Sequence, residues 1–350
     1  MNTRLRLWIA DYLASRAPRN DAVRDFAARR GCKLLAGTAL LLAFVSAAVG
    51  AAVCPAGEAK KHYWATSLSR AVDANIMQGL YAAVTRGEIG WLDVDPRRPL
   101  ARLAPGINLI LYHVGGNCYI GPDCDRFPFS QPTDDRWGER ERGIDLTDAA
   151  TRKIVVNDLL AIVQRADKIA PADASIGVHV DNVHRLGAQD LAALFNDYLA
   201  AIAAAKGQGL ISKGRNTGYI AKNNPRGFKR ALDQKLLDSV PFYVISENAT
   251  LREDGRLNGQ SRIAQDIGRC YGIPVFLKTF GSDIAYRIGQ QDPPGERGRE
   301  VHVTREMARE MARLPHIAGV AWSVDEGRYH PVEFVQGAPV APCGENCEAD

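Results

Sequence analysis

Short apolar runs alternate with helical stretches from residue 89 onward. The runs contain four to seven residues and end at polar or turn residues, which is typical of buried strands. They are Ile89–Val94, Ile107–His113, Gly143–Leu146, Ile176–Asp181, Gly218–Ala221, Phe242–Ser246, Ile273–Lys278 and Ile317–Ser323. Between them a helical apolar period is clear over 151–169, 188–206, 259–270 and 304–314, and less regular over 97–104 and 225–238.

Eight strands separated by helical crossovers predict an α/β fold with parallel strands. The pattern fits a (β/α)8 TIM barrel over residues 60–335, followed by a C-terminal tail at 336–350. A doubly wound open sheet is the alternative architecture.

Polar residues stand at or just after the ends of these runs. The carboxyl ends of parallel barrel strands form the active-site face, so the polar residues are expected on one rim. They are Asp93, His113, Asp145, Asp181, Asn182, Lys222, Asn223, Glu247, Asn248, Lys278 and Asp325. Turn formation accounts for some Asp and Asn at such places, but acids, amides and lysines together indicate a site.

The N-terminal segment has a different composition. Residues 1–33 contain eight Lys/Arg and three Asp, and the twenty residues Leu34–Val53 carry no charge. This pattern predicts a signal or anchor helix within residues 1–58, either a cleaved signal or an uncleaved membrane anchor, with a buried core helix as the remaining alternative. Both export readings place the barrel outside the cytoplasm as a secreted, periplasmic or anchored protein, in contact with the membrane only through this segment.

Charge and composition exclude some partners. The chain is 46% hydrophobic and 24% charged, as expected for a globular protein. Its net charge of +4 arises in the leader, so the body presents no basic surface and no nucleic-acid partner is expected.

Cysteine spacing agrees with export. Cys118 with Cys124, and Cys343 with Cys347, are close enough in sequence for two local disulfides. Metal binding by Cys118 and Cys124 is the alternative, although no second ligand pair with zinc spacing accompanies them. Cys270, in an apolar context, is expected to be a buried free thiol.

Two carboxylates across a barrel mouth are the machinery of glycoside hydrolysis, one as nucleophile or base and the other as acid. The amides and Lys222 suit hydroxyl or N-acetyl groups. The aromatic residues Trp91, Tyr112, Trp137 and Trp322 suit stacking on sugar rings. Paired acids on a barrel rim also occur in metal-dependent lyases and aldolases.

Signatures of other chemistries are missing from the sequence. It has no Gly-x-Ser-x-Gly elbow, no Walker loop and no His-Glu-x-x-His helix. His179 and His184 on either side of Asp181 are a possible metal pair, but a structural or substrate-contacting role is favoured for them. No metal and no cofactor is predicted.

Seven segments occur in a consistent order between about residues 89 and 285. They are Asp93-Val-Asp95 with LAPGINLILYHVGG, then GPDCDRFP, WGERERGIDLTD, VHVDNVHRL, GYIAKNNP, FYVISENA and IPVFLKTF. In this order they resemble the endo-α-1,4-polygalactosaminidase-like glycoside hydrolases of family 114.

That resemblance implies a TIM barrel with Asp181 as nucleophile and Glu247 as general acid/base. The implied activity is retaining, endo-acting hydrolysis of an α-linked polysaccharide of galactosamine or N-acetylgalactosamine type. The residues expected to bind this polysaccharide are Asp93, Tyr112, His113, Asp123, Asp145, Asn182, Lys222, Asn223, Asn248 and Trp322.

The sequence departs from the family pattern at three places. His184 replaces an Asp after Asp-Asn-Val, the acidic residue expected near 112–117 is absent, and Lys278-Thr279-Phe280 replaces a closing Glu-Tyr. These changes keep two alternatives open: a catalytically impaired polysaccharide-binding or biogenesis protein on the same barrel, and an unrelated barrel enzyme. The sequence does not define an oligomeric state.

Overall fold

The computed structural model describes residues 63–65, 90–94, 107–119, 124–127, 130–132, 141–280, 286–287, 300–323 and 333–336. The predicted leader, the helix expected at 97–104 and almost all of the predicted tail lie outside these ranges. The chain divides into two compact units, Met1–Val53 and Cys54–Asp350, and every described residue belongs to the second. No helix within the described ranges is long and apolar enough to cross a membrane.

The largest sheet among the described residues has the strand order β1-β2-β3-β7-β8-β9-β10-β13-β14. Each of the first seven strands is parallel to the next, whereas β14 is antiparallel to β13. In sheet order the strands are Tyr63–Ala65, Trp91–Val94, Asn108–Val114, Ile176–Asp181, Thr217–Lys222, Tyr243–Glu247, Val275–Phe280, Gly319–Ser323 and Glu333–Gln336. The fold is therefore α/β with a parallel sheet, as the sequence predicts.

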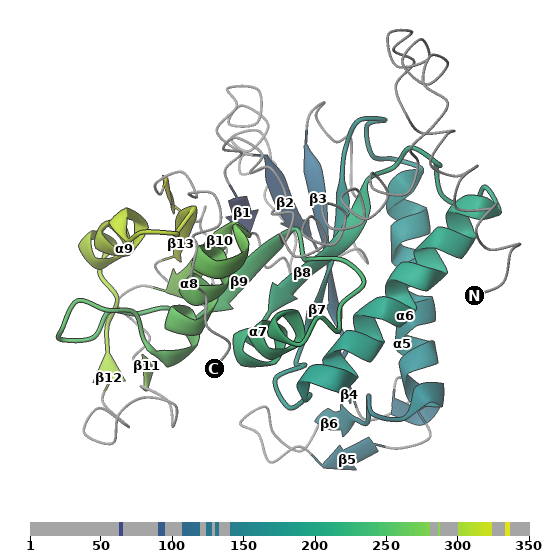
Figure 1. Ribbon diagram of the computed structural model, residues 1–350, viewed down its shortest axis with the longest axis horizontal. Helices are drawn as coiled ribbons and strands as arrows, with labels where there is room; N and C mark the ends of the chain where they lie inside the picture. Colours follow the sequence, from purple (N-terminus) through teal and green to yellow (C-terminus); the bar gives the residue numbers. More distant parts are fainter. Residues whose placement is uncertain are drawn as a thin grey trace, which may run out of the picture. The chain divides into compact units, whose positions relative to one another are not determined.

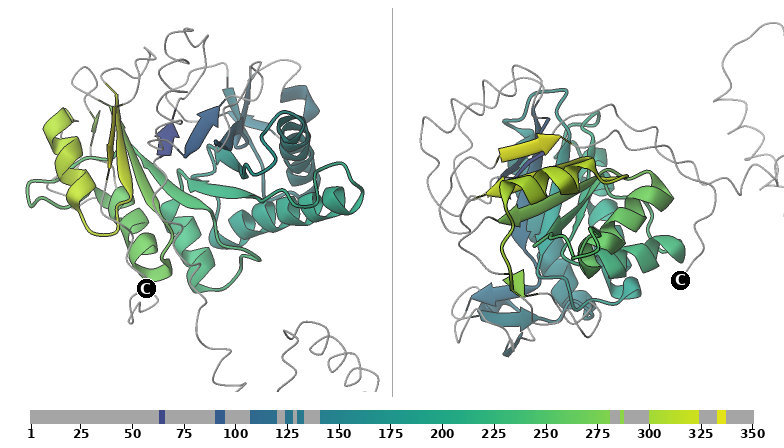
Figure 2. Two further views of the ribbon diagram at one scale, coloured as in Figure 1. Left: turned by 90° about the horizontal axis from the view of Figure 1, so that it is seen from above. Right: turned by 90° about the vertical axis from the view of Figure 1, so that its left-hand side faces the viewer.

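Helices return the chain between successive parallel strands. They are α5 (Ala149–Asp167), α6 (Ala188–Gly207), α7 (Pro225–Asp233), α8 (Gly259–Tyr271) and α9 (Arg305–Arg313). The sheet is curled, and these helices lie along its convex side (Figures 1 and 2). A curled parallel sheet inside a layer of helices is the arrangement of a TIM-barrel-like fold.

Side-chain caps explain where three of the helices begin. Asp148, Asn224 and Thr304 each accept a hydrogen bond from the backbone N–H three residues later, before α5, α7 and α9. Pro225 occupies the first turn of α7, where its missing N–H is no loss. The helices predicted within the described ranges are confirmed, although α7 ends at Asp233 rather than at residue 238.

A second, antiparallel sheet corrects one strand prediction. It has the order β4-β6-β5, formed by Asn117–Tyr119, Glu141–Ile144 and Ser130–Pro132, with the short helix η2 (Cys124–Arg126) between β4 and β5. Residues 143–146, predicted as a barrel strand, therefore end β6 and lead into α5. A further small pair joins β11 (Tyr286–Arg287) to β12 (Glu300–Val301).

The parallel strand that takes the missing place is β1, which pairs with β2 at the start of the sheet. Its three residues, Tyr63–Ala65, are too short a run to register as a periodic strand. The described residues thus contain eight parallel strands, the number that the sequence predicts, but the prediction assigns one of them wrongly.

Alternate strand residues face two separate cores. One core fills the space between the sheet and the helices. The other lies inside the curled sheet and is built from Trp91, Ile110, Ile220, Tyr243, Ile245 and Phe276. Phe242 packs against this inner core, and a Cβ at Gly218 would lie 2.7 Å from its ring. The glycine therefore makes room for the aromatic ring that closes the interior.

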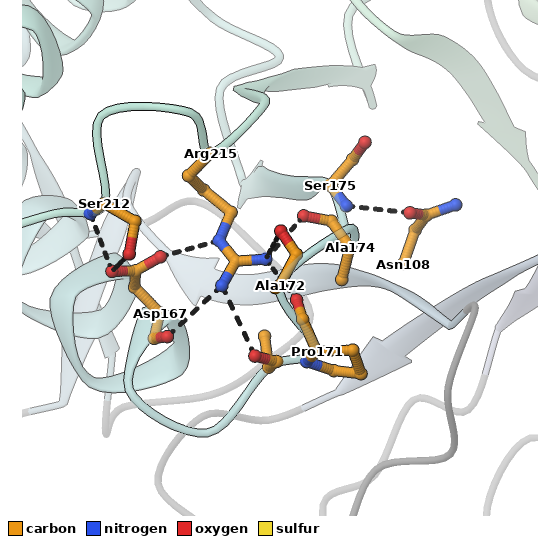
Figure 3. Close-up of polar contacts among 9 residues, drawn as sticks. Asn108, Asp167, Pro171, Ala172, Ala174, Ser175, Ser212 and Arg215 are labelled. Carbon is orange, nitrogen blue, oxygen red and sulfur yellow. Dashed lines mark hydrogen bonds and ion pairs between the residues drawn. The ribbon is translucent and has the colours of Figure 1, made fainter.

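The start of β8 is tied to the turn before β7 by a buried arginine (Figure 3). Arg215 is 4% exposed, and its Nε donates to Asp167 Oδ1 at 2.6 Å. Its guanidinium also donates to the Pro171 and Ala174 carbonyls, while the N–H and hydroxyl of Ser212 donate to Asp167 Oδ2. This cluster lies at the amino ends of the strands, the end of such folds associated with stability.

Cysteine pairing is partly as predicted. Cys118 and Cys124 form a disulfide with their Cα atoms 5.1 Å apart, which confirms that pairing. Cys270, predicted as a buried free thiol, is instead half-buried and disulfide-bonded. The apolar residues around Cys270 do not indicate that it pairs with a cysteine far away along the sequence. Cys343 and Cys347 lie outside the described residues.

Candidate active site

Polar side chains replace apolar ones at the carboxyl ends of neighbouring strands. Strand residues alternate between faces, so the residue two positions after an inner-core residue also points into the curled sheet. Three such steps are Ile220 to Lys222 on β8, Ile245 to Glu247 on β9 and Phe276 to Lys278 on β10. The apolar interior therefore ends in a charged layer.

Asp181, the last residue of β7, is held by donors on both carboxylate oxygens. The Tyr112 hydroxyl donates to Oδ2 at 3.0 Å. The backbone N–H of Asn182 donates to Oδ1 at 2.8 Å, and the Asn223 amide donates to the same oxygen. Lys222 Nζ lies 3.8 Å from Oδ2. These contacts fix the orientation of the carboxylate at the mouth.

Glu247, the last residue of β9, lies between two lysines. Its Oε1 is 2.7 Å from Lys222 Nζ and 2.9 Å from Lys278 Nζ. The lysine side chains are only 3% and 7% exposed, respectively. Lys222 thus bridges the two carboxylates, and its ammonium also lies 5.7 Å from the centre of the Tyr112 ring. Such a cation over an aromatic face gains further attraction.

The lysines favour the ionised forms of both acids. Burial alone would raise the pKa of Glu247, but the charges of Lys222 and Lys278, with their hydrogen bonds, lower it far below the ordinary value. Burial would likewise raise the pKa of Asp181. The positive charge of Lys222 lowers this pKa strongly, whereas the negative charge of Glu247 raises it. On balance the pKa of Asp181 is lowered. Both groups are therefore carboxylates at neutral pH.

Each of the three central strands, β7, β8 and β9, is followed directly by an asparagine with left-handed backbone geometry. The φ angles are 61° at Asn182, 59° at Asn223 and 57° at Asn248. Asparagine adopts this conformation more readily than other residues with a side chain. The chain can therefore leave each strand directly after Asp181, Lys222 or Glu247.

The glycine pair after β3 allows the end of β7 to approach closely. A Cβ at Gly116 would lie 1.8 Å from the Asn182 carbonyl oxygen, and one at Gly115 would lie 2.2 Å from Val180 Cγ1. The Gly116 N–H donates to the Asp181 carbonyl at 3.1 Å, and the Gly116 carbonyl accepts from Ile144 at 2.8 Å. The small sheet is thereby joined to the strand that carries Asp181.

Several predicted site residues lie together, and others do not. Tyr112, Asp181, Asn182, Lys222, Asn223 and Glu247 share the contacts described above. Asn248 is adjacent in sequence but exposed, and its carbonyl accepts from the Asn258 amide. The backbone of Asp93 belongs to β2, its side chain is not among those described, and Asp123 lies outside the described residues.

Three predicted substrate contacts have other surroundings. His113 Nε2 is 3.8 Å from Asp158 on α5, outside the curled sheet. The Trp322 indole donates to the Val303 carbonyl at 3.0 Å, and its ring packs against the core under the helices. Asp145 follows β6 and accepts from the backbone and hydroxyl of Thr147. The sequence predicts His113 and Asp145 on the rim and Trp322 as a residue that stacks on sugar rings, but the strand faces and the second sheet give these side chains the surroundings described here.

Two further residues lie at the site: Lys278, which the sequence predicts on the rim, and His179, for which it favours a structural or substrate-contacting role. Lys278 ends an inner-face alternation with Phe276, a signal visible in the sequence. His179 is 1% exposed, and its ring meets the Tyr112 ring edge-on with centroids 5.1 Å apart. His184 is exposed. The described residues contain no group of three or more potential metal ligands.

Fold and site together define a class: a barrel-like parallel α/β protein with two carboxylates bridged by lysine at the carboxyl ends of its strands. No family model matches the chain, and no curated protein does. Similarity is found among solved structures. Ega3 of Aspergillus fumigatus, in complex with galactosamine, has a TM-score of 0.46 and 16% identity over 77% of this chain and 93% of its own. The glycoside hydrolase domain of PelA from Pseudomonas aeruginosa has a TM-score of 0.42 and 14% identity over 77% of this chain and 95% of its own.

Proposed function

We propose that this protein is a glycoside hydrolase that cleaves an α-linked amino-sugar polysaccharide of galactosamine or N-acetylgalactosamine type. The observation that carries the proposal is the pairing of Asp181 and Glu247 around Lys222 at the carboxyl ends of the strands. The resemblance of the sequence segments to family 114 supports the substrate class. A closed (β/α)8 barrel is part of the same proposal.

The geometry favours a retaining mechanism. The Lys222 ammonium lies 3.8 Å from Asp181 Oδ2 and 2.7 Å from Glu247 Oε1. The distance between these two carboxylate oxygens therefore cannot exceed the sum of the two distances. Retaining pairs are about 5–5.5 Å apart, whereas inverting pairs need about 6.5–9.5 Å to admit a water. Asp181, oriented by Tyr112 and Asn223, is the proposed nucleophile.

Glu247 is the proposed general acid/base. In the first step an acid protonates the departing glycosidic oxygen, and in the second the same group, as a base, activates water. Lys222 and Lys278 hold Glu247 ionised, which suits the second step and disfavours the first. Departure of the leaving group is therefore the slow step in this proposal.

The test uses partially deacetylated galactosaminan and measures the release of reducing ends. Asp181→Asn is expected to lower the rate by about a thousandfold or more, because an amide does not attack the anomeric carbon. Glu247→Gln is expected to lower it by about a hundredfold, and less on aryl glycosides whose leaving group needs little protonation.

Matched controls come from exposed acids elsewhere in the fold. Asp173→Asn and Glu310→Gln change exposed side chains and are expected to retain wild-type rates. If Asp181→Asn and Glu247→Gln both retain wild-type rates as well, the proposed catalytic pair is wrong.

The double ion pair at Glu247 favours one second candidate, a polysaccharide-binding protein without hydrolysis. Two buried lysines hold Glu247 in its ionised form, in which it has no proton to donate to a leaving group. The ion pairs still keep the polar side chains at the carboxyl ends of the strands in place. Binding of the polymer without any release of reducing ends by the wild type would support this candidate over the enzyme.

Export is proposed for either candidate. The basic leader and the uncharged Leu34–Val53 run predict it, and the Cys118–Cys124 disulfide supports it because such bonds persist mainly in oxidising compartments. Fractionation of the producing cell tests it, and a soluble, full-length cytoplasmic protein would contradict it.

A further inference from the structure

We propose that Asn224 is a positioning residue of this site, because its buried side chain holds the end of β8 against the turn that follows β7. The inference rests on the proposed function, since it concerns how the Asp181 carboxylate is kept in place for catalysis. The described hydrogen bonds of the Asn224 side chain go to backbone atoms and not to the carboxylates, so its effect on the site is indirect.

The backbone pairing of β7 with β8 ends before it reaches the site. The last pair in its register is His179 opposite Ile220. Asp181 and Lys222 each lie two residues beyond that pair, whereas the pairing of β3 with β7 extends to Asp181 itself. The ladder therefore spaces the two strands, but other contacts must hold their ends together.

The Asn224 side chain supplies such contacts. Its Nδ2 donates to the carbonyls of Val183 and Leu186, both at 2.9 Å, and its Oδ1 accepts from the Gly227 N–H at 2.9 Å. The Leu186 N–H donates to the Val183 carbonyl at 3.1 Å, so the two carbonyls belong to one closed turn. Asn224 is 8% exposed, and loss of its amide would leave these carbonyls without that donor in a buried place.

The neighbours of Asn224 along the chain connect it to the nucleophile. Asn224 directly follows Lys222 and Asn223, which both contact the Asp181 carboxylate. The turn that it holds begins at Val183, two residues after Asp181. Fixing this turn to the end of β8 therefore fixes the geometry in which Lys222 and Asn223 meet the carboxylate.

Gly227, in the first turn of α7, leaves room for the Asn224 side chain. A Cβ at Gly227 would lie 2.7 Å from both Nδ2 and Oδ1 of Asn224. Gly227→Ala would thus displace this side chain without removing it, while alanine itself favours the helix. Substitutions at the two positions perturb the same contacts by different routes.

The experiment measures kcat/KM of the full chain for reducing-end release from partially deacetylated galactosaminan across a range of pH. Asn224→Ser keeps a side-chain oxygen that caps α7, but serine is too short to donate to the two carbonyls. It is expected to lower kcat/KM by at least about tenfold, because small displacements of a reacting group are costly. Gly227→Ala is expected to lower kcat/KM as well.

The pH profile separates positioning from a loss of folded protein. Titratable groups from four strands face Asp181, namely Tyr112 on β3, His179 on β7, Lys222 on β8 and Glu247 on β9. Among these, Lys222 adjoins the segment that Asn224 holds, and its positive charge lowers the pKa of Asp181. When Lys222 is displaced, the pKa of Asp181 rises, so the acid limb of the kcat/KM profile should move to higher pH by about half a unit or more.

A matched control removes a helix cap elsewhere. Thr304→Ala deletes the side-chain cap of α9, a helix that packs against β13 and β14, and should lower the melting temperature but leave the acid limb in place. Thermal melts establish that each variant is folded. An unmoved acid limb in folded Asn224→Ser and Gly227→Ala, with or without a lower rate, overturns the inference alone. A wild type that releases no reducing ends overturns the proposed function and this inference together.

Discussion

At the scale of single residues, the three asparagines that follow β7, β8 and β9 connect backbone geometry to the site. Asn182, Asn223 and Asn248 each follow a site residue and each has a positive φ. The turn after the strand begins at once, so Asp181, Lys222 and Glu247 stand at the edge of the mouth rather than within the sheet. Two of the asparagines also donate hydrogen bonds to the Asp181 carboxylate, Asn182 through its backbone N–H and Asn223 through its side-chain amide.

Asn248 allows this backbone requirement to be tested without touching the carboxylates, because its side chain is exposed. Asn248→Ala is expected to destabilise the protein by about 1 kcal/mol, since alanine resists the left-handed conformation. Asn248→Gly should cost less, because glycine has no Cβ to clash. Urea denaturation gives both values, and equal losses for alanine and glycine would contradict the explanation.

The residues of the site could be predicted from the sequence only in part. Asp181 ends a clear apolar run, and Lys222 and Glu247 each follow one directly, so the sequence predicts their position at a strand end. Tyr112 and His113 are neighbours on β3, and only the strand register decides that Tyr112 faces Asp181 while His113 faces Asp158. A single-residue shift exchanges such faces, and apolar pattern alone does not fix it here.

At the scale of elements, the contact between the ends of β3 and β7 determines where Asp181 lies. Gly115 and Gly116 have no side chains to separate the two strands, and Gly116 bonds both to β7 and to the small sheet. Both glycines are needed here for space, since neither is among the residues with positive φ.

Gly116→Ala is expected to destabilise the protein by about 1–3 kcal/mol, because the new Cβ would overlap the Asn182 carbonyl. Displacement of Asp181 should also lower polymer cleavage or binding well beyond the loss of folded protein. The matched control is Gly214→Ala, where a Cβ meets nothing within 4 Å. Denaturation and activity assays on both variants test this, and a silent Gly116→Ala would show that the strand ends can separate without consequence.

The elements themselves show why sequence patterns succeed or fail. The long helices α5 and α6 and strand β7 have regular apolar periods and were predicted within a few residues. Residues 143–146 have the composition of a parallel strand, but Gly143 and Ile144 pair antiparallel in a separate sheet and residues 145–146 lead into α5. Composition predicts that a segment is extended, whereas its partner depends on the tertiary fold.

At the scale of the whole described fold, the two ends of the sheet have different tasks. The amino ends carry the Arg215–Asp167 cluster, which ties loops to strands (Figure 3). The carboxyl ends carry Asp181, Glu247 and the lysines. This separation resembles the division between stability and chemistry common in parallel barrels.

Acid stability tests the amino-end cluster. Burial would raise the pKa of Asp167, but hydrogen bonds from Arg215 and Ser212 and the Arg215 charge lower it below the ordinary value of 3.8. A lowered folded-state pKa stabilises the protein above the ordinary pKa, and this stabilisation is lost as the pH falls through the folded-state pKa.

Asp167→Asn is therefore expected to destabilise the protein by about 3–5 kcal/mol at neutral pH, since it leaves Arg215 buried without its carboxylate. The difference from the wild type should shrink as the pH falls below the ordinary pKa, because the unfolded state takes up the proton before the folded state does. Denaturation at pH 7 and at about pH 2.5 measures both effects. A constant difference across this range would mean that the Asp167 charge is not what stabilises the turn.

The antiparallel strand β14 has a consequence for how the curled sheet closes. β13 pairs with β10 on one edge and with β14 on the other, and β1 lies near β13 without a hydrogen-bonded ladder between them in the described residues. Among the described strands, the outer edge of β13 is thus occupied by β14. The unbroken parallel ladders from β3 to β10 keep neighbouring strands at a fixed spacing, so the distance between Asp181 and Glu247 is set by the backbone of the sheet and not by their side chains alone.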